Sequence, residues 1–202
     1  MKALIIGGGI GGLSMALSLH AAGIEACVCE SVAQIDALGL GINLQANAVR
    51  ELIELGLGDA LADTAIETST LAYYNKHGQS IWSEPRGRAA GYAWPQYSIH
   101  RGELLMVLLN AARARLGAEN VRSGHHFVSF EQSAGGVVAH FVDRVTARPL
   151  PPLNGDVLIG ADGIQSTVRR QLYPDEAAPW RVAASNGAAP SRRRPISTAA
   201  AR

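Results

Sequence analysis

A glycine-rich turn directly after the first strand places the tightest constraint on this chain. Residues 2–6 are an apolar run that predicts a β-strand, and the segment that follows, Gly7-Gly8-Gly9-Ile10-Gly11-Gly12, has the spacing G-x-G-x-x-G. A helical stretch over 13–22 comes next, then a second apolar strand over 24–29 that ends at Glu30. A glycine turn between strand and helix, with an acid closing the next strand, is typical of dinucleotide binding.

Each part of this motif has its own physical task. Gly7 permits the tight turn, Gly9 lets a pyrophosphate approach the backbone, and Gly12 lets the helix pack closely on the strand. The helix N-terminus offers unpaired N–H groups and a partial positive charge to the phosphates. Glu30 can accept hydrogen bonds from ribose hydroxyls. The sequence therefore predicts a dinucleotide site at its start.

The composition fits one sizeable core with room for a second, smaller domain. The chain has 202 residues, of which 48% are hydrophobic, and a formal charge of +1. That value hides an asymmetry, because residues 181–202 carry five Arg and no acid, which leaves a net negative body. Neither this body nor the short run Arg192-Arg193-Arg194 predicts nucleic-acid binding. No apolar run approaches the roughly eighteen residues that span a membrane, and the start lacks a signal-peptide pattern, so we expect a cytoplasmic protein.

The cysteines and histidines predict no metal site and no disulfide. Cys27 and Cys29 lie two residues apart on the second predicted strand, where both side chains face the same way. We expect them to be buried, reduced thiols. The six histidines are scattered, with no spacing that suits a metal.

Beyond Glu30 the pattern departs from a regular alternation of strand and helix. We expect helices over 45–57, 60–63, 101–116 and 164–172, and strands over 68–75, 79–82, 96–100, 127–131, 136–142 and 156–159. His77-Gly78 between the first two of these strands indicates a hairpin. Residues 84–95 are expected to form a loop, and the proline-rich run Pro149-Leu150-Pro151-Pro152 a connection.

A second strand–turn–helix motif lies at Gly160-Ala161-Asp162-Gly163. Two interpretations of Asp162 are open on the residues alone. The carboxylate caps the helix that follows, which is a common use of Asp, or the motif forms a second part of the dinucleotide site.

Taken together, these motifs resemble the flavin-dependent aromatic hydroxylases of the para-hydroxybenzoate hydroxylase fold. The similarity is greatest to the branch with phenazine-carboxylate and hydroxybenzoate monooxygenases. It also rests on residues 39–43, 82–87 and 95–104, which occur in the same order. The resemblance implies an α/β fold, with a Rossmann-like FAD-binding domain over 1–180 that contains part of an inserted β-sheet substrate domain at about 66–100.

The resemblance also implies a set of cofactor-binding residues. The FAD pyrophosphate would be held by Gly7, Gly9, Ile10, Gly11 and Gly12. The adenosine ribose would be bound by Glu30. The isoalloxazine ring or ribityl chain would run beside Leu40, Gly41 and Ile42.

Three further positions complete the implied site. Arg101 would contact the middle of the cofactor, where a guanidinium suits phosphate and hydroxyl oxygens. Phe127 takes the place against adenine where the family usually has a smaller aliphatic residue. Asp162 would serve flavin and nicotinamide binding, either by touching the pyrophosphate or by shaping the turn.

The chain also departs from the family pattern. The family is about twice as long and has a third motif, a Gly-Asp pair before a helix, which is missing here. From Arg181 onward the sequence becomes rich in Ala, Arg and Ser without any period. We therefore expect a truncated or frameshifted chain with a disordered tail over 181–202, which by itself holds little FAD and is inactive.

The resemblance implies an FAD-dependent monooxygenase that consumes NAD(P)H and O2 and hydroxylates an aromatic, carboxylate-bearing substrate. It indicates no catalytic acid or base, and His100 is interpreted as an ordinary strand histidine. The alternative is a non-catalytic nucleotide-binding fragment, the product of a degenerate gene. An NAD-linked dehydrogenase is disfavoured by the Gly160–Gly163 motif, and a flavin disulfide reductase by the spacing of Cys27 and Cys29.

Overall fold

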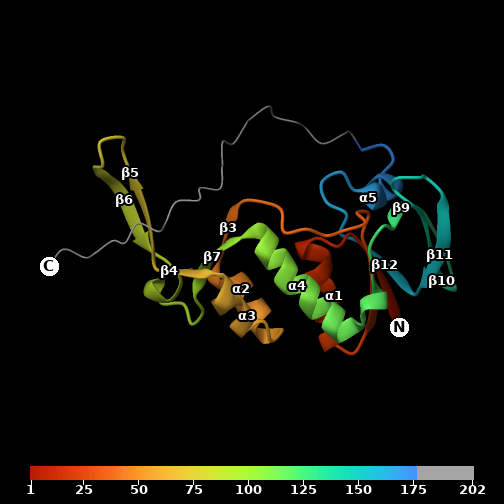
Figure 1. Cartoon of the computed structure of the whole chain (residues 1–202), viewed down its shortest axis with the longest axis horizontal. Coiled ribbons are helices and arrows are strands. Elements are labelled where there is room, and N and C mark those ends of the chain that lie inside the picture. The colour runs from red at the N-terminus through yellow and green to blue at the C-terminus, as the bar shows by residue number, and fades with distance from the viewer. Residues whose placement is uncertain (177–202) are drawn as a thin grey trace.

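The computed structural model describes residues 1–176 and shows an α/β body from which one hairpin projects (Figure 1). The helices are α1 (Ile10–Ala21), α2 (Ala46–Glu54), α3 (Gly58–Thr64), α4 (Arg101–Leu116) and α5 (Thr167–Leu172), with short 3-10 turns η1 (Gly87–Ala90) and η2 (Ala118–Asn120). The tail expected over 181–202 lies outside the described residues. Within those residues, we find no helix with the length and apolar character needed to cross a membrane.

The strands form several small sheets. They are β1 (Lys2–Ile6), β2 (Glu25–Cys29), β3 (Gly41–Leu44), β4 (Ile66–Thr68), β5 (Thr70–Tyr74), β6 (Ser80–Pro85), β7 (Gln96–His100), β8 (Val121–Arg122), β9 (His126–Ser133), β10 (Gly136–Val142), β11 (Pro149–Gly155) and β12 (Val157–Gly160).

The central sheet is parallel and has the order β12-β1-β2-β8. If the four strands of this sheet are numbered by their place in the sequence, their order across the sheet is 4-1-2-3. This is the strand order of one mononucleotide-binding half of a Rossmann fold. Lys2 pairs with Glu25 on one side of β1, and Ala3 pairs with Val157 on the other. The expected Rossmann-like α/β fold is confirmed.

Side chains of the central sheet alternate between two faces, as the pleat of a strand requires. Ile5 of β1 faces the helical layer of α1 and α4. Leu4 and Ile6 face the opposite way, together with Cys27 and Cys29 of β2, against the second sheet. The two cysteines are buried free thiols on one face, as expected.

The second sheet is antiparallel and has the order β11-β10-β9. It covers the central sheet with the buried side chains of Phe127, Val137 and Phe141. The expectation that residues 149–152 only connect two elements was wrong, because they belong to β11. Prolines are tolerated there because β11 is an edge strand, where a missing N–H interrupts no ladder.

The region expected to carry part of a substrate sheet is rich in strands. A small sheet has the order β3-β7-β4, and β5 and β6 form a separate two-stranded hairpin. The predicted turn is confirmed: Gly78 has φ +80°, and Asn75 Oδ1 accepts hydrogen bonds from the backbone N–H groups of His77 (2.9 Å) and Gln79 (3.0 Å).

Several predicted boundaries were wrong. The single strand expected over 68–75 is divided at Ser69, because β4 pairs with β7 whereas β5 pairs with β6. β6 continues to Pro85, which pairs with Thr70, so the expected loop begins later. α5 begins at Thr167 rather than Ile164, because Gly163 has φ +80° and two polar side chains cap the helix after it.

Candidate functional site

A cleft of about 520 Å³ opens where the parallel strands β1, β2 and β12 end. Ligands of open α/β sheets bind outside the carboxyl ends of the strands. The cleft brings together residues that are far apart in sequence, among them Gly7, Gly9, Glu30, Phe127, Arg144 and Asp162. Five of these six were predicted from the sequence.

The glycines of the turn differ in what their missing side chain does. Gly7 has φ +111°, and a Cβ atom there would lie 2.3 Å from the carbonyl oxygen of Ala161. A Cβ on Gly12 would lie 1.9 Å from the carbonyl oxygen of Gly7. Both positions therefore need glycine for the fold itself.

Gly9 is different, because a Cβ placed there has no neighbour within 4 Å among the described residues. Gly9 is also the residue that precedes the first turn of α1, and it lines the cleft. The packing of the protein thus leaves open space at Gly9 next to the N–H groups of a helix start. That space suits an anionic group that approaches the backbone closely.

Glu30 connects the end of β2 to the glycine turn. Its Oε2 accepts a hydrogen bond from the Gly8 N–H (2.7 Å), and its Oε1 accepts one from the Val32 N–H (2.9 Å). The side chain is half-buried and lines the cleft. Glu30 therefore holds the turn in shape, and each carboxylate oxygen retains a second lone pair for a ligand.

Asp162 caps α5. Its Oδ2 accepts hydrogen bonds from the N–H groups of Thr167 (2.6 Å) and Val168 (3.2 Å), and its Oδ1 accepts one from the Ser166 hydroxyl (2.5 Å). The sequence left two interpretations of Asp162 open, and the structure shows that its carboxylate caps α5. The residue also lines the cleft, so direct contact with a ligand stays a prediction.

The cleft is also lined by basic side chains that the sequence did not predict. Arg144 lies in the turn between β10 and β11, and its Nη1 donates to the Ser31 hydroxyl (3.4 Å). Ser31 Oγ is also 3.0 Å from Nδ1 of His126. Arg170 of α5 lines the cleft as well. No local motif could reveal Arg144 and His126, because the packing of the second sheet on the central one brings them to Ser31.

The wall of the cleft contains an aromatic ring and a thiol. Phe127 is buried and meets Phe141 edge to face, with ring centroids 6.0 Å apart. A hydrogen bond with Cys29 lowers the pKa of Cys27 to about 7. The same bond and burial raise the pKa of Cys29, so the thiol that lines the cleft stays protonated at neutral pH.

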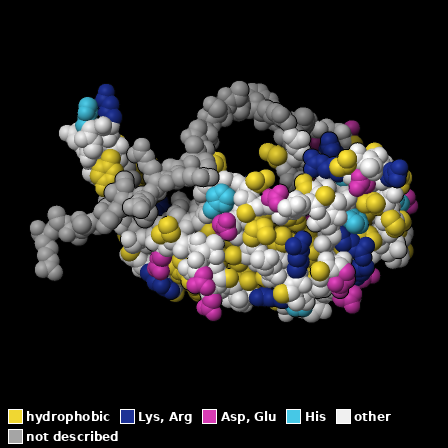
Figure 2. All heavy atoms as spheres, in the orientation of Figure 1, with side chains coloured by type: hydrophobic (Ala, Val, Ile, Leu, Met, Phe, Trp, Pro, Cys, Tyr) yellow, Lys and Arg dark blue, Asp and Glu magenta, His cyan; other side chains and the backbone are white. Residues whose placement is uncertain are grey.

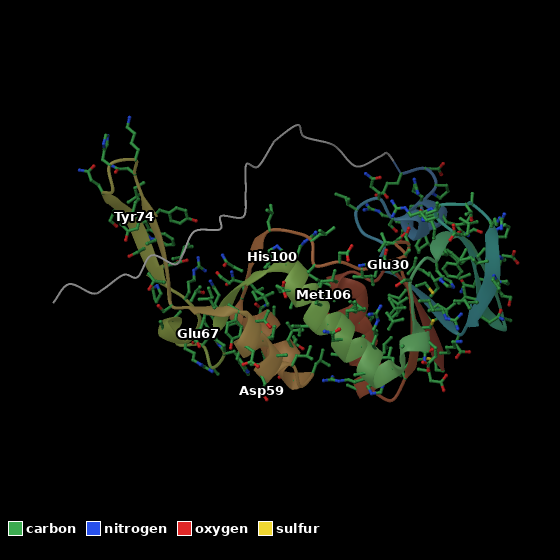
Figure 3. The ribbon with its side chains drawn as sticks, viewed as in Figure 1. Glu30, Asp59, Glu67, Tyr74, His100 and Met106 are labelled. Atoms are coloured by element: carbon green, nitrogen blue, oxygen red, sulfur yellow. The ribbon has the colours of Figure 1, made fainter. Side chains whose placement is uncertain are left out.

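The remaining predicted residues do not line this cleft. Leu40, Gly41 and Ile42 gather instead with Arg101 at the N-terminus of α4. The Arg101 N–H donates to the Leu40 carbonyl (2.9 Å), and Gly41 pairs with His100 across β3 and β7. Figure 3 shows Glu30 and His100 well apart along the long axis of the molecule.

This second group is tightly packed. His100 Nε2 is 2.9 Å from the carbonyl oxygen of Gly39, and Gly39 has φ +144°. A Cβ on Gly39 would lie 2.7 Å from Nε of Arg101, and a Cβ on Gly102 would lie 2.2 Å from the carbonyl carbon of Ala37. The loop before β3 is therefore held against the start of α4. The predicted site residues thus form two groups, one in the cleft at the carboxyl ends of β1, β2 and β12 and one at the N-terminus of α4.

Comparison with known proteins gives consistent matches. A family model for an FAD binding domain matches residues 1–192. Phenazine 1,6-dicarboxylic acid hydroxylase PhzS of Lysobacter antibioticus is 48% identical over 182 residues, which cover 89% of this chain and 45% of that protein. The 3-hydroxybenzoate 6-hydroxylase 1 of Aquipseudomonas alcaligenes is 33% identical over 178 residues, covering 85% and 43%.

Solved structures agree. The crystal structure of Klebsiella pneumoniae HpxO complexed with FAD and uric acid matches with a TM-score of 0.70 and 30% identity, covering 85% of this chain and 41% of that one. Tetrameric 2-methyl-3-hydroxypyridine-5-carboxylic acid oxygenase matches with a TM-score of 0.68 and 27% identity, covering 85% and 42%. The chain spans less than half the length of these relatives.

Proposed function

The chain belongs to the FAD binding domain family, and on that premise we propose that it serves an FAD-dependent monooxygenase which consumes NAD(P)H and O2 and hydroxylates a small aromatic acid. The observation that carries this proposal is the open space at Gly9. The fold excludes a side chain at Gly7 and Gly12 by backbone collisions, whereas nothing in the described protein fills the position beside Gly9. A dinucleotide pyrophosphate accounts for that space.

The two groups of residues have separate tasks in this proposal. The glycine turn and the start of α1 bind the pyrophosphate through backbone N–H groups and the helix dipole. Glu30 accepts hydrogen bonds from ribose hydroxyls while it keeps its bonds to Gly8 and Val32. Phe127 and Arg144 line the same cleft, and in this proposal they face the adenosine.

The second group suits the other half of the cofactor. Leu40, Gly41 and Ile42 present backbone next to Arg101, whose guanidinium can hold phosphate or hydroxyl oxygens. When bound, FAD supplies the redox chemistry, and the protein contributes orientation and exclusion of water. No acid–base residue is assigned.

Two experiments test the proposal. The first is an FAD titration of the 202-residue chain, followed by flavin fluorescence, with Gly9→Val as the comparison. We expect weak binding that Gly9→Val abolishes. Equal binding by both variants, or none by the wild type, contradicts the proposal.

The second experiment asks whether this chain can support catalysis. Residues 1–176 replace the corresponding segment of the 48% identical Lysobacter hydroxylase. We expect the purified chimera to retain FAD and to oxidise NAD(P)H faster when an aromatic acid is added. A chimera that binds FAD without any such stimulation favours the alternative, a non-catalytic nucleotide-binding fragment.

A further inference from the structure

The loop before β3 is hydrogen-bonded to the junction of β7 and α4, where Figure 3 shows His100. We call residues 37–40 the 37–40 loop. The N–H group of Arg101 donates to the Leu40 carbonyl (2.9 Å). The carbonyl oxygen of the preceding residue, Gly39, lies 2.9 Å from Nε2 of His100. Two consecutive residues of the junction thus hold two consecutive carbonyl oxygens of the loop.

The side chains of the 37–40 loop contribute little to holding it in place. Leu38 is 70% exposed and Leu40 is 38% exposed, so these two side chains bury little apolar surface. Gly39 has no side chain, and its φ of +144° lies where other residues are strained. The position of the loop therefore depends on contacts with its backbone.

Two side chains make polar contacts with this backbone, and they differ in strength. Nη2 of Arg101 donates to the Leu38 carbonyl at 3.5 Å, which exceeds the usual range of about 2.7–3.2 Å. The Arg101 side chain is also exposed, and in the proposed function its guanidinium turns to the cofactor. His100 is half-buried and makes the shorter contact. It is therefore the side chain that can hold the loop while Arg101 binds the ligand.

The contact with Gly39 determines which nitrogen of the neutral His100 ring carries the proton. A carbonyl oxygen only accepts hydrogen bonds, so the proton must be on Nε2. Nδ1 is then an acceptor, and it is buried without a partner among the described residues. The other neutral tautomer would bury an N–H group without an acceptor and would turn the lone pair of Nε2 toward the Gly39 oxygen. The packing thus suits the Nε2–H tautomer alone.

We propose that His100 is a positioning residue for FAD: by donating from Nε2 to the Gly39 carbonyl, it keeps the 37–40 loop in the shape that receives the flavin half of the cofactor. This inference rests on the proposed function, which places the flavin half beside Leu40. His100 acts through the loop and touches no reacting atom. The adenosine half of FAD lies in the cleft at Gly9, so its binding does not depend on His100.

Three substitutions separate the hydrogen bond from the space that the His100 ring fills. His100→Leu removes the donor. His100→Gln keeps an amide N–H group about as far from the backbone as Nε2 is. His100→Asn has the same amide one methylene closer to the backbone, too short to reach the Gly39 carbonyl. His77→Leu makes the first change on an exposed turn and is the control.

Three measurements on the 202-residue chain test the proposal. Amide hydrogen exchange over residues 37–44, without FAD, reports the loop. Calorimetric titrations with FAD and with ADP compare the whole cofactor with a probe that lacks the flavin half. Two-bond correlations between the ring nitrogens and carbon-bound protons of His100, recorded by NMR on the 15N-labelled wild type, identify the tautomer.

We expect His100→Leu and His100→Asn to accelerate exchange over 37–44 and to weaken FAD binding, each about tenfold, as loss of one neutral hydrogen bond does. His100→Gln should restore both properties. ADP affinity and exchange in α1 should match the wild type in every variant, and His77→Leu should match it throughout.

Unchanged loop exchange in His100→Leu, or equal behaviour of His100→Gln and His100→Asn, overturns the proposal. Equal losses of FAD and ADP affinity, or a proton on Nδ1, also overturn it. If the wild type binds neither FAD nor ADP, the proposed function is contradicted, and the exchange rates still decide whether His100 holds the 37–40 loop.

Discussion

The glycines of the turn after β1 separate requirements of folding from requirements of binding. Gly7 and Gly12 avoid collisions with backbone atoms of the protein itself, whereas Gly9 avoids no atom of the described structure. Glycine is therefore required for two different physical reasons within these six positions. Substitutions can tell these causes apart.

We expect Gly9→Val to abolish FAD binding and to leave folding nearly unchanged, because its side chain enters open space beside the start of α1. Gly12→Ala should instead destabilise the fold itself and lose FAD binding as a consequence, since its Cβ meets the Gly7 carbonyl oxygen at 1.9 Å. Flavin fluorescence reports binding, and thermal unfolding followed by circular dichroism reports the fold. If Gly9→Val purifies with FAD bound, the pyrophosphate is not at this turn.

Glu30 combines both kinds of requirement. Glu30→Ala should weaken FAD binding by about ten- to a hundredfold, because charge-assisted hydrogen bonds to ribose contribute about 1.5–3 kcal/mol. It should also destabilise the FAD-free chain, since the Gly8 and Val32 N–H groups lose their acceptor. Glu30→Gln, which keeps one acceptor oxygen, should lose less stability in urea unfolding. Unchanged flavin affinity in Glu30→Ala would show that the adenosine is placed wrongly.

At the scale of elements, the strand–turn–helix unit from β12 to α5 depends on its caps. Asp162 satisfies two backbone N–H groups of α5 and one hydroxyl, and Ser166 Oγ accepts a hydrogen bond from the Arg169 N–H (2.9 Å). A helix of six residues has little stability of its own. Its position beside the cleft therefore depends on these side chains.

We expect Asp162→Ala to lower the free energy of unfolding by about 1–2 kcal/mol, as loss of a helix cap does. Amide hydrogen exchange over 167–172 should accelerate, whereas exchange in α4 should not change. Asp175→Ala removes an exposed acid nearby and serves as the control. If Asp162→Ala is as stable as this control but binds FAD less tightly, the main role of the Asp162 carboxylate is to contact the ligand and not to cap α5.

At the scale of the whole molecule, the hairpin β5–β6 stands away from the body with its side chains uncovered (Figures 1 and 2). Ile81 is 68% exposed and Trp82 is 48% exposed. Tyr73 and Tyr74 have exposed fractions between these two values. Tyr73 and Trp82 contact each other, with ring centroids 5.9 Å apart, but no second layer covers them among the described residues. Uncovered strands of this kind promote association.

We therefore expect the isolated chain to self-associate at micromolar concentration. The double variant Ile81→Thr/Trp82→Thr should remain monomeric, because Thr retains a preference for strands but removes apolar surface. Size-exclusion chromatography with light scattering measures the oligomeric state of the wild-type chain and of the double variant. A wild-type chain that is monomeric at about 100 µM would show that the hairpin does not promote self-association in solution.

The sequence by itself determined the elements whose signals are local. The glycine turn after β1, the helix over Arg101–Leu116 and the hairpin at Gly78 were predicted, although α1 begins at Ile10 and not at residue 13. Such signals are local, since backbone conformation and side-chain period depend on neighbouring residues. The resemblance to the FAD-dependent hydroxylases likewise followed from short motifs, and the family was confirmed. The roles assigned to individual site residues stay predictions.

Only the tertiary structure decided which residues meet. The proline-rich residues 149–152 predicted a connecting loop, because no local signal distinguishes an edge strand such as β11 from a loop. Arg144 reaches Ser31 across more than a hundred residues, and the predicted site separates into two groups because Arg101 packs on the loop before β3. No local signal in the sequence indicates that Gln96 is buried. Such contacts depend on how sheets and helices pack together, and packing is a property of the whole folded chain.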